Sequence, residues 1–401
     1  MEPTAREEEL LLPEGTRLLH IGPHKTGTTS LQGALFAARQ EMLAQGVCHA
    51  GRSRNPAAAV QAVTGRPSPY SDQSPPISQW RSLVREIRSA REPRVVVSSE
   101  FFAWAKPDAI RGIVEDLDRA RVHVAVTLRP LGRIMPSHWQ QNVQAGSLAS
   151  FESWLDGLFN QPDGKGAPFW TLHRHDRLIA RWAEVVGPKN VTAVVVDDRD
   201  HGVVLRAFEQ LLGLREGTLV EVPALANRSL TLPETEAIRA FNKAYKAEGL
   251  NKALYARVMR FGAAQLMKSR QPADDEPNVE MPQWALDRAT EIGREIVVNI
   301  AASGVRVVGD LELLTRAQVS RLDGDRAPAA QVSPRVAAAM AMGILVATGA
   351  ARRGLTTSGP FSFAEPVELA RVPTYQVVGV VALRVRNAVA RRWRRVRERT
   401  R

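Results

Sequence analysis

The chain has 401 residues, which is enough for one large domain or two ordinary domains with a sizeable buried core. Apolar residues make up 44% and charged residues 24%, as in a soluble globular protein, and a single cysteine, Cys48, excludes an intramolecular disulfide and a multi-cysteine metal site. The net charge of +12 is uneven, because residues 384–401 hold nine arginines and one glutamate and so carry +8. Residues 1–16 are acidic and lack an apolar segment of signal-peptide length, so we expect a flexible N-terminus and a cytoplasmic protein.

Short apolar runs alternate with longer segments of helical periodicity in the first half of the chain. The runs are rich in β-branched residues and leucine, which favours buried parallel strands, and the longer segments place apolar residues about 3.6 positions apart. This alternation predicts an α/β fold, a parallel sheet with helices on both faces. The expected strands are Arg17–Ile21, Arg94–Ser98, Val122–Leu128 and Val191–Val196, and the expected helices include Leu31–Leu43, Ile110–Leu117 and Leu172–Val186.

From about residue 230 the helical pattern dominates. We expect this helical layer to continue one domain over residues 17–315, followed by an Ala/Arg-rich extension over residues 316–401. A Pro- and Ser-rich stretch at Gly65–Ser78 should be a loop, equally consistent with a substrate lid or an irregular connection. The layer's expected helices are Pro233–Glu248, Lys252–Lys268 and Trp284–Ala302.

The extension contains two segments with their own patterns. Val336–Ala351 has no charged residue but is rich in Ala, Gly and Thr, which favours a buried or docking helix over a membrane span. Val377–Arg401 predicts a basic amphipathic helix with a valine stripe. Its apolar face can dock on the domain, or the helix can contact an anionic membrane peripherally. Because no nucleic-acid motif accompanies the arginines, we expect no nucleic-acid partner.

The stretch LLHIGPHKTGTTSLQGAL, residues 18–35, combines an apolar strand, a glycine-containing turn and a helix that starts near Thr28. Free N–H groups of the turn and the positive end of the helix dipole form a cradle for an anion. Helix capping alone explains hydroxyls at this position, but a lysine, a glycine and four hydroxyls within six residues exceed what capping needs. The candidate ligands are His24, Lys25, Thr26, Gly27, Thr28, Thr29 and Ser30.

The order of residues in this loop separates two kinds of phosphate site. The nucleoside-triphosphatase loop places its lysine after the second glycine, whereas Lys25 precedes Gly27 here. GPHKTGTTSLQ instead resembles the loop of the sulfotransferase family, whose motif is close to PKxGTT. The resemblance extends over about residues 17–314. It implies a P-loop-like three-layer sandwich, a bound 3′-phosphoadenosine-5′-phosphosulfate (PAPS) and no metal ion.

A second anion site is expected at the end of the Val122–Leu128 strand. Arg129 follows this strand, and Ser137 comes eight residues later. In sulfotransferases an arginine and a serine at this spacing bind the 3′-phosphate of the donor. Arginine suits that role because its charge is permanent and its planar fork matches phosphate oxygens. Pro130 directly follows the arginine, one place earlier than in many relatives.

Glu100, just after the Arg94–Ser98 strand, is the candidate general base, and the resemblance implies the same role, since several sulfotransferases use a glutamate there. Neighbouring Phe101, Phe102 and Trp104 can shield its carboxylate from water. The position is also explained by a helix start that favours a glutamate. His24 and His138 are competing bases, and His173 and His175 point to different helix faces, which argues against a metal pair.

The sequence therefore predicts a PAPS-dependent sulfotransferase acting on a hydroxyl or amine of a carbohydrate, glycolipid or small molecule. Lys25 and Glu100 are its expected catalytic residues. Two alternatives stay open: a Mg²⁺-dependent nucleotide kinase or triphosphatase on the same fold, and a non-catalytic, membrane-associated binding protein.

Overall fold

A computed structural model of the protein describes residues 10–67, 73–200, 202–222, 228–316 and 331–348. The chain divides into two compact units, Met1–Arg352 and Arg353–Arg401. The basic segment Val377–Arg401 and most of the acidic N-terminus lie outside the described residues.

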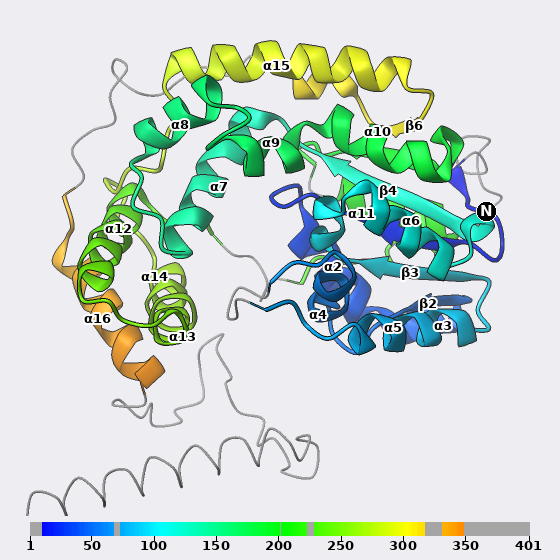
Figure 1. The fold of residues 1–401 in the computed structure, drawn as a ribbon, viewed down its shortest axis with the longest axis horizontal. Helices are drawn as coiled ribbons and strands as arrows, with labels where there is room; N and C mark the ends of the chain where they lie inside the picture. The colour runs from blue at the N-terminus through cyan, green and yellow to red at the C-terminus, as the bar shows by residue number, and fades with distance from the viewer. Residues whose placement is uncertain (1–9, 68–72, 201, 223–227, 317–330, 349–401) are drawn as a thin grey trace, which may run out of the picture. The chain divides into compact units, whose positions relative to one another are not determined.

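The first unit is built on a six-stranded parallel sheet with the strand order β2-β3-β1-β4-β5-β6 (Figure 1). All four expected strands are present within a residue of their predicted ends. Two short edge strands were not predicted. The strands are β1 (Arg17–His20), β2 (Val47–His49), β3 (Arg94–Ser98), β4 (Val122–Leu128), β5 (Val191–Val195) and β6 (Arg306–Val308).

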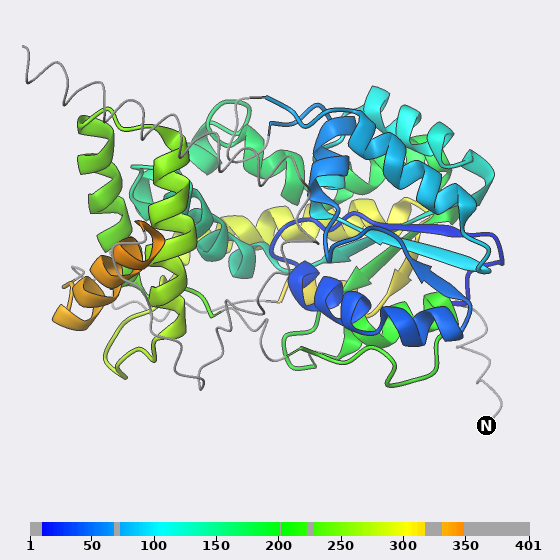
Figure 2. The same cartoon turned by 90° about the horizontal axis from the view of Figure 1, so that it is seen from below.

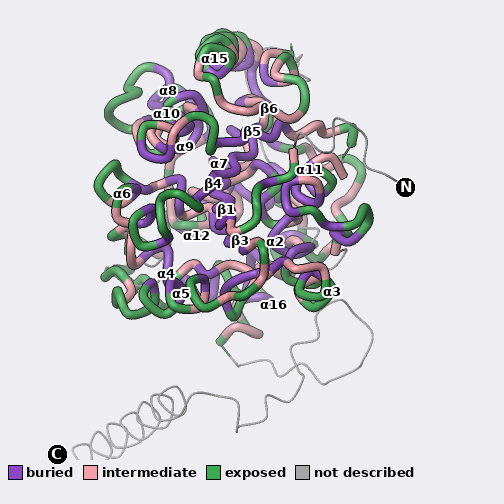
Figure 3. The backbone as a smooth tube through the Cα atoms, turned by 90° about the vertical axis from the view of Figure 1, so that its right-hand side faces the viewer, coloured by how far each residue is buried: buried purple, intermediate pink, exposed green. Residues whose placement is uncertain are grey.

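Helices cover both faces of this sheet, so the predicted α/β fold class is confirmed. Leu18 and Val96 point to one face, and Leu19 and Val97 point to the other, since successive side chains of a strand alternate. Both faces pack into apolar cores, and the strands other than β6 are largely buried between the helical layers (Figure 3). One layer holds α2 (Thr28–Ala37), α3 (Arg39–Ala44) and α11 (Val203–Leu212), and the other holds α4 (Ala57–Val63), α5 (Ser78–Ser89), α6 (Pro107–Asp116) and α10 (His175–Val186).

Further helices extend the second layer beyond the sheet. Two of the expected helices are each divided in two: residues 31–43 belong to α2 and α3, and residues 172–186 to α9 and α10, with Arg174 between them. The additional elements are α7 (Leu131–Gln144), α8 (Phe151–Asn160), α9 (Ala167–His173), α15 (Gln283–Ala302) and the short helices η1 (Glu100–Trp104), η2 (Arg119–Arg121), η3 (Pro188–Asn190) and η6 (Leu311–Leu314).

Two of the three helices expected after residue 230 belong to a separate group, which both Figure 1 and Figure 2 place at some distance from the strands, whereas the third, α15, packs on α7 and α10. The expected helix Lys252–Lys268 is divided into three consecutive elements. Helix α16 belongs to this group, although its sequence lies in the predicted extension. Within the described residues, no helix is both long and apolar enough to cross a membrane. The group comprises α12 (Leu232–Ala247), α13 (Lys252–Tyr255), the π-helix η5 (Ala256–Ala263), α14 (Ala264–Ser269) and α16 (Pro334–Thr348).

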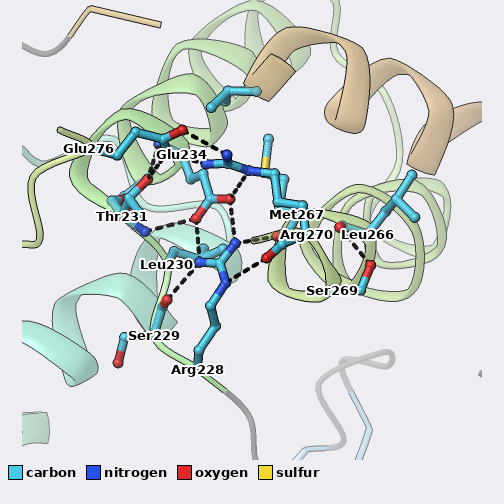
Figure 4. Close-up of polar contacts among 12 residues, drawn as sticks. Arg228, Ser229, Leu230, Thr231, Glu234, Leu266, Met267, Ser269, Arg270 and Glu276 are labelled. Atoms are coloured by element: carbon cyan, nitrogen blue, oxygen red, sulfur yellow. Dashed lines mark hydrogen bonds and ion pairs between the residues drawn. The ribbon is translucent and has the colours of Figure 1, made fainter. Parts of the chain in front are cut away.

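A buried ion-pair network fixes the start of α12 against the end of α14 (Figure 4). The fully buried carboxylate of Glu234 accepts hydrogen bonds from Arg228 at 2.7 and 2.8 Å and from Arg270 Nε at 2.6 Å. Glu234 also completes a capping box with Thr231, so one side chain serves both the helix start and the network. Arg270 in turn pairs with Glu276 of the following loop.

Replacing Glu234 with Gln should lower the free energy of unfolding by about 3 kcal/mol, because two largely buried guanidinium groups would lose their shared counter-ion. Urea denaturation measures this change. The control is Glu291→Gln in the exposed pair with Arg288, where we expect at most about 1 kcal/mol. Equal, small effects of the two substitutions would show that the network adds nothing beyond a surface pair.

Candidate functional site

The predicted anion loop connects β1 to α2 at the carboxyl edge of the sheet. It has three residues with positive φ angles, namely Gly22 (80°), Lys25 (70°) and Gly27 (83°). This conformation is uncommon for a residue with a side chain, so Lys25 is a strained position of the kind that collects at binding sites. Residue 22 must be glycine for a second reason: a Cβ there would lie 2.9 Å from the Cβ of Glu100.

Behind the loop, a chain of buried hydrogen bonds ties it to three strands. The His20 ring bonds the Ser98 hydroxyl at 2.7 Å and the Thr127 hydroxyl at 3.3 Å. The Thr127 hydroxyl in turn contacts that of Thr26 at 2.6 Å, and Thr26 donates to the carbonyl of Pro23 at 2.7 Å. Burial lowers the pKa of His20 to about 3, so its ring is neutral. Thr26, a predicted ligand, is fully buried, and its hydroxyl is engaged in this support.

The remaining hydroxyl residues of the loop lie at the start of α2. Gly27 precedes the helix and provides no side-chain cap for its first N–H groups, which are therefore left for another acceptor. Thr29 is exposed and Thr28 is buried. The Ser30 hydroxyl donates to Glu221 at 3.2 Å. In this conformation Ser30 is thus paired with a carboxylate.

The charge of Lys25 is destabilised by its surroundings. Burial lowers its pKa to about 8, and the positive charge of Lys268 in α14 adds to this effect. Glu100 acts in the opposite direction, while Arg129 and Arg260 lower the pKa further. Lys25 and Arg129, the key residues of the two predicted anion sites, are therefore within electrostatic range of each other. An anion placed among these cations would relieve their repulsion.

Glu100 is the first residue of helix η1, directly after β3. It lies against the loop, because its backbone and Cβ are close to Gly22. One carboxylate oxygen, Oε2, accepts hydrogen bonds from Gln32 at 2.8 Å and from Asn55 at 2.7 Å. The other, Oε1, lies 3.9 Å from Nδ1 of His24. The two side-chain amides thus orient the carboxylate and leave Oε1 for other partners. His24 packs edge-on against Phe101, and burial lowers the pKa of His24 despite the nearby Glu100.

Arg129 and Ser137 line one cavity of 730 Å³ at the carboxyl ends of β4 and β5. Helix α7 continues through Pro136, which brings Ser137 to this cavity. The loop residues 22–30 are not among the residues that line this cavity. Lys25 and Ser137 therefore do not line the same cavity. The cavity's other polar lining residues are Arg133, Gln140, Asp197, Asp198, Arg199, Ser229, Asn278, Glu280 and Arg316.

Asp198 is a cavity residue that the sequence analysis did not single out. Its Oδ1 accepts from Arg129 Nε at 3.0 Å and lies 2.7 Å from a terminal nitrogen of the same guanidinium. Its Oδ2 lies 3.5 Å from Arg133 Nε. The carboxylate therefore bridges two arginines and leaves the remaining N–H groups of Arg129 for a ligand. The sequence did contain one signal for Asp198: it follows the expected strand Val191–Val196, whose end lies at the same sheet edge as Arg129.

Three buried histidines lie behind Arg129. His138 Nδ1 and His173 Nε2 are 3.1 Å apart, and His175 Nε2 donates to the backbone carbonyl of Arg129 at 3.2 Å. Burial, together with the charges of His24 and Lys25, lowers the pKa of His138 to about 3. His138, one of the competing candidates for the general base, thus lies near the site, but its ring is neutral. The sequence did not predict His173 and His175 at this place. Its periodicity indicated one continuous helix, whereas the chain turns at Arg174, and this turn brings both rings close to α7.

The described residues contain no group of three or more His, Cys, Asp or Glu side chains that could hold a metal ion. No protein-family model and no curated protein matches the sequence. Among solved structures, the chain is similar to a sulfotransferase from Alicyclobacillus acidocaldarius, at 14% sequence identity and a TM-score of 0.36, over 59% of this chain and 94% of that one. A similarity of this size carries no functional argument, so the function has to be inferred from the site itself.

The affinity for sulfate should depend on pH through Lys25. Since the ammonium form binds the anion and its pKa is about 8, we expect affinity to be constant below pH 7 and about tenfold weaker at pH 9. Calorimetric titration with sulfate, whose own charge is constant over this range, measures the effect. Lys25→Arg should abolish the dependence, because arginine stays charged; a variant that keeps the same slope would assign it to another group.

Proposed function

We propose that the protein transfers a sulfuryl group from PAPS to a hydroxyl or amine of a carbohydrate, glycolipid or small-molecule acceptor. The observation that carries this proposal is the strained loop around Lys25, which lies next to Glu100 and within electrostatic range of Arg129. Anion-binding cations and a carboxylate at one edge of a parallel sheet are what such a transfer requires.

Lys25 has the role of meeting the charge that develops during transfer. The acceptor oxygen or nitrogen attacks sulfur, and the bond between sulfur and the phosphate oxygen of the donor breaks. The electron pair of that bond stays on the phosphate, so adenosine 3′,5′-bisphosphate leaves with an added negative charge. The Lys25 ammonium and the uncapped N–H groups at the start of α2 stabilise that charge.

Arg129 and Ser137 have the role of binding the 3′-phosphate. Asp198 holds one edge of the Arg129 guanidinium, and His175 holds its backbone carbonyl. Positions fixed in this way lose little entropy when the donor binds. Lys25 is outside the wall of the Arg129 cavity, so the donor must extend from that cavity towards the loop; the mutual effect of the two cations supports this path.

Glu100 has the role of general base. Its Oε1 accepts the acceptor's proton while Gln32 and Asn55 keep the carboxylate in place through Oε2. His138 suits this role poorly, because a ring with a pKa of about 3 is a weak proton acceptor near neutral pH. His24 adjoins the same carboxylate and serves to orient it.

The kinase or triphosphatase alternative is less well supported by the loop. In nucleoside triphosphatases the hydroxyl residue after the lysine binds Mg²⁺. The residue at this place is Thr26, whose hydroxyl is buried and bonded to Thr127, so it does not face a position for Mg²⁺. A binding experiment separates the two functions: adenosine 3′,5′-bisphosphate should raise the melting temperature in the absence of metal, and Mg-ATP should not. The reverse result would favour the alternative.

The proposed cytoplasmic location and the proposed acceptor class rest on the sequence alone.

Lys25→Ala should reduce kcat/KM for PAPS by about 10²- to 10³-fold, as expected when a charge-stabilising donor is removed. Donor consumption with a panel of sugars, lipids and phenols first identifies an acceptor, and steady-state kinetics then measure the change. Lys189→Ala, at an exposed lysine in η3, is the matched control and should leave the rate unchanged. Wild-type turnover by the Lys25 variant would remove the lysine from the mechanism.

Glu100→Gln should lower kcat about 10²-fold and leave the affinity for adenosine 3′,5′-bisphosphate unchanged, because the amide keeps the shape but cannot take the proton. Kinetics and calorimetry measure the two quantities separately. Glu184→Gln, at an exposed position of α10, serves as the control. If kcat stays within a few-fold of wild type, Glu100 is a structural residue of the loop and the base lies elsewhere.

A further inference from the structure

Helix α16 is apolar on both of its sides, although only one side is packed. Arg335 is its single charged residue. Val336 and Gly343 are buried against the helical group, while Met342 and Leu345 on the other side are 46% and 43% exposed. A surface helix of a globular protein normally has polar residues on its outer side. The outer side of α16 therefore has the composition of a contact surface.

The neighbouring helix η5 extends this surface. Gly262 and Gly343 form the crossing point of the two helices, because a Cβ on Gly262 would lie 2.5 Å from the Gly343 carbonyl oxygen. Phe261 and Met342 each adjoin one of these glycines in sequence, and Phe261 is 55% exposed. Two helical turns before Phe261, Leu254 of α13 is 37% exposed. We call the exposed side chains of Leu254, Phe261, Met342 and Leu345 the α16 face.

The two segments that carry the α16 face contain basic residues and no acidic ones. Residues 250–270 and α16 contain no aspartate or glutamate. Arg257, between Leu254 and Phe261 in sequence, is exposed and donates to the carbonyl of Ala347 at 2.7 Å, which connects η5 to the end of α16. The exposed basic residues of these two segments are Lys252, Arg257, Arg260 and Arg335, whereas Arg270 is paired with Glu234 and Glu276.

We propose that the α16 face binds the surface of a lipid bilayer that contains anionic headgroups. Apolar side chains bordered by basic residues are the composition of helices that lie in the interface plane, with the apolar groups at the boundary of headgroups and acyl chains. A second copy of this chain fits less well, since it would bring together two pairs of helical segments that have basic residues and no acidic ones. An anionic bilayer complements both the apolar and the basic residues.

The α16 face does not include the basic segment Val377–Arg401, which lies outside the described residues and for which the sequence alone predicts membrane contact. The chain runs from the end of α16 into residues 349–401, so the two segments are neighbours in sequence. Stable membrane association generally takes two signals, an apolar one and a polybasic one. The α16 face supplies the apolar signal.

Co-sedimentation of the full-length protein with vesicles tests the proposal. One set of vesicles is phosphatidylcholine, and the other holds equal parts of phosphatidylcholine and phosphatidylserine. Wild-type protein should bind the second set and lose binding as salt is raised. Leu254→Ser/Met342→Ser/Leu345→Ser should weaken binding about tenfold or more, since three apolar groups no longer insert. Val298→Ser, at a 66% exposed position on α15, is the control and should bind as wild type.

Two results would overturn the proposal. If the triple variant binds the mixed vesicles as wild type does, the α16 face is not the bilayer contact, because every variant keeps residues 349–401. If wild type is a dimer by light scattering, and the triple variant is a monomer with unchanged vesicle binding, the face is an interface between copies of the chain. An unchanged melting temperature of the triple variant shows that any loss of binding is not a loss of fold.

Discussion

The position of the anion loop depends on the buried hydrogen bonds that run from Ser98 through His20 to Thr127 and Thr26. These groups come from β3, β1, β4 and the loop itself, so the three central strands and the loop share one polar chain inside an apolar core. A buried polar group without a hydrogen-bond partner costs free energy, so the loss of one member of this hydrogen-bonded series would destabilise the others. The loop therefore leaves the sheet along one path, and Lys25 is held in a backbone conformation that a free loop would avoid.

The same geometry links the predicted anion loop to Glu100, the proposed base. Gly22 approaches Glu100 so closely that no side chain fits between them, so a displacement of the loop also displaces the carboxylate. On the other side, the turn at Arg174 brings His175 to the backbone of Arg129, and Asp198 fixes the guanidinium. The residues proposed to hold the donor, to bind its phosphate and to act as the base are thus positioned by contacts that lie within the core or at its edge.

The sequence predicts the central strands well, because each is a short β-branched run with a clear end. It also predicts the residues at the carboxyl edge, since parallel strands present their ends together. It does not predict β2 and β6, which are only three residues long and too short for a periodic signal. Nor does it predict the partners of the candidate residues. The pairing of Arg129 with Asp198 spans 69 residues, and local pattern contains no information about such contacts.

The helical group contributes to the electrostatics of the site, although it is separate from the sheet in sequence. After burial, Lys268 of α14 is the largest cause of the lowered pKa of Lys25, and Arg260 of η5 adds to it. The Glu234 network holds the end of α14 in place, so a structural ion pair fixes the helix that carries Lys268, a cation within electrostatic range of Lys25. Such like-charge proximity costs folding energy unless an anion shares the space. The helical group thus provides part of the positive potential around Lys25, which the proposed anionic donor would neutralise.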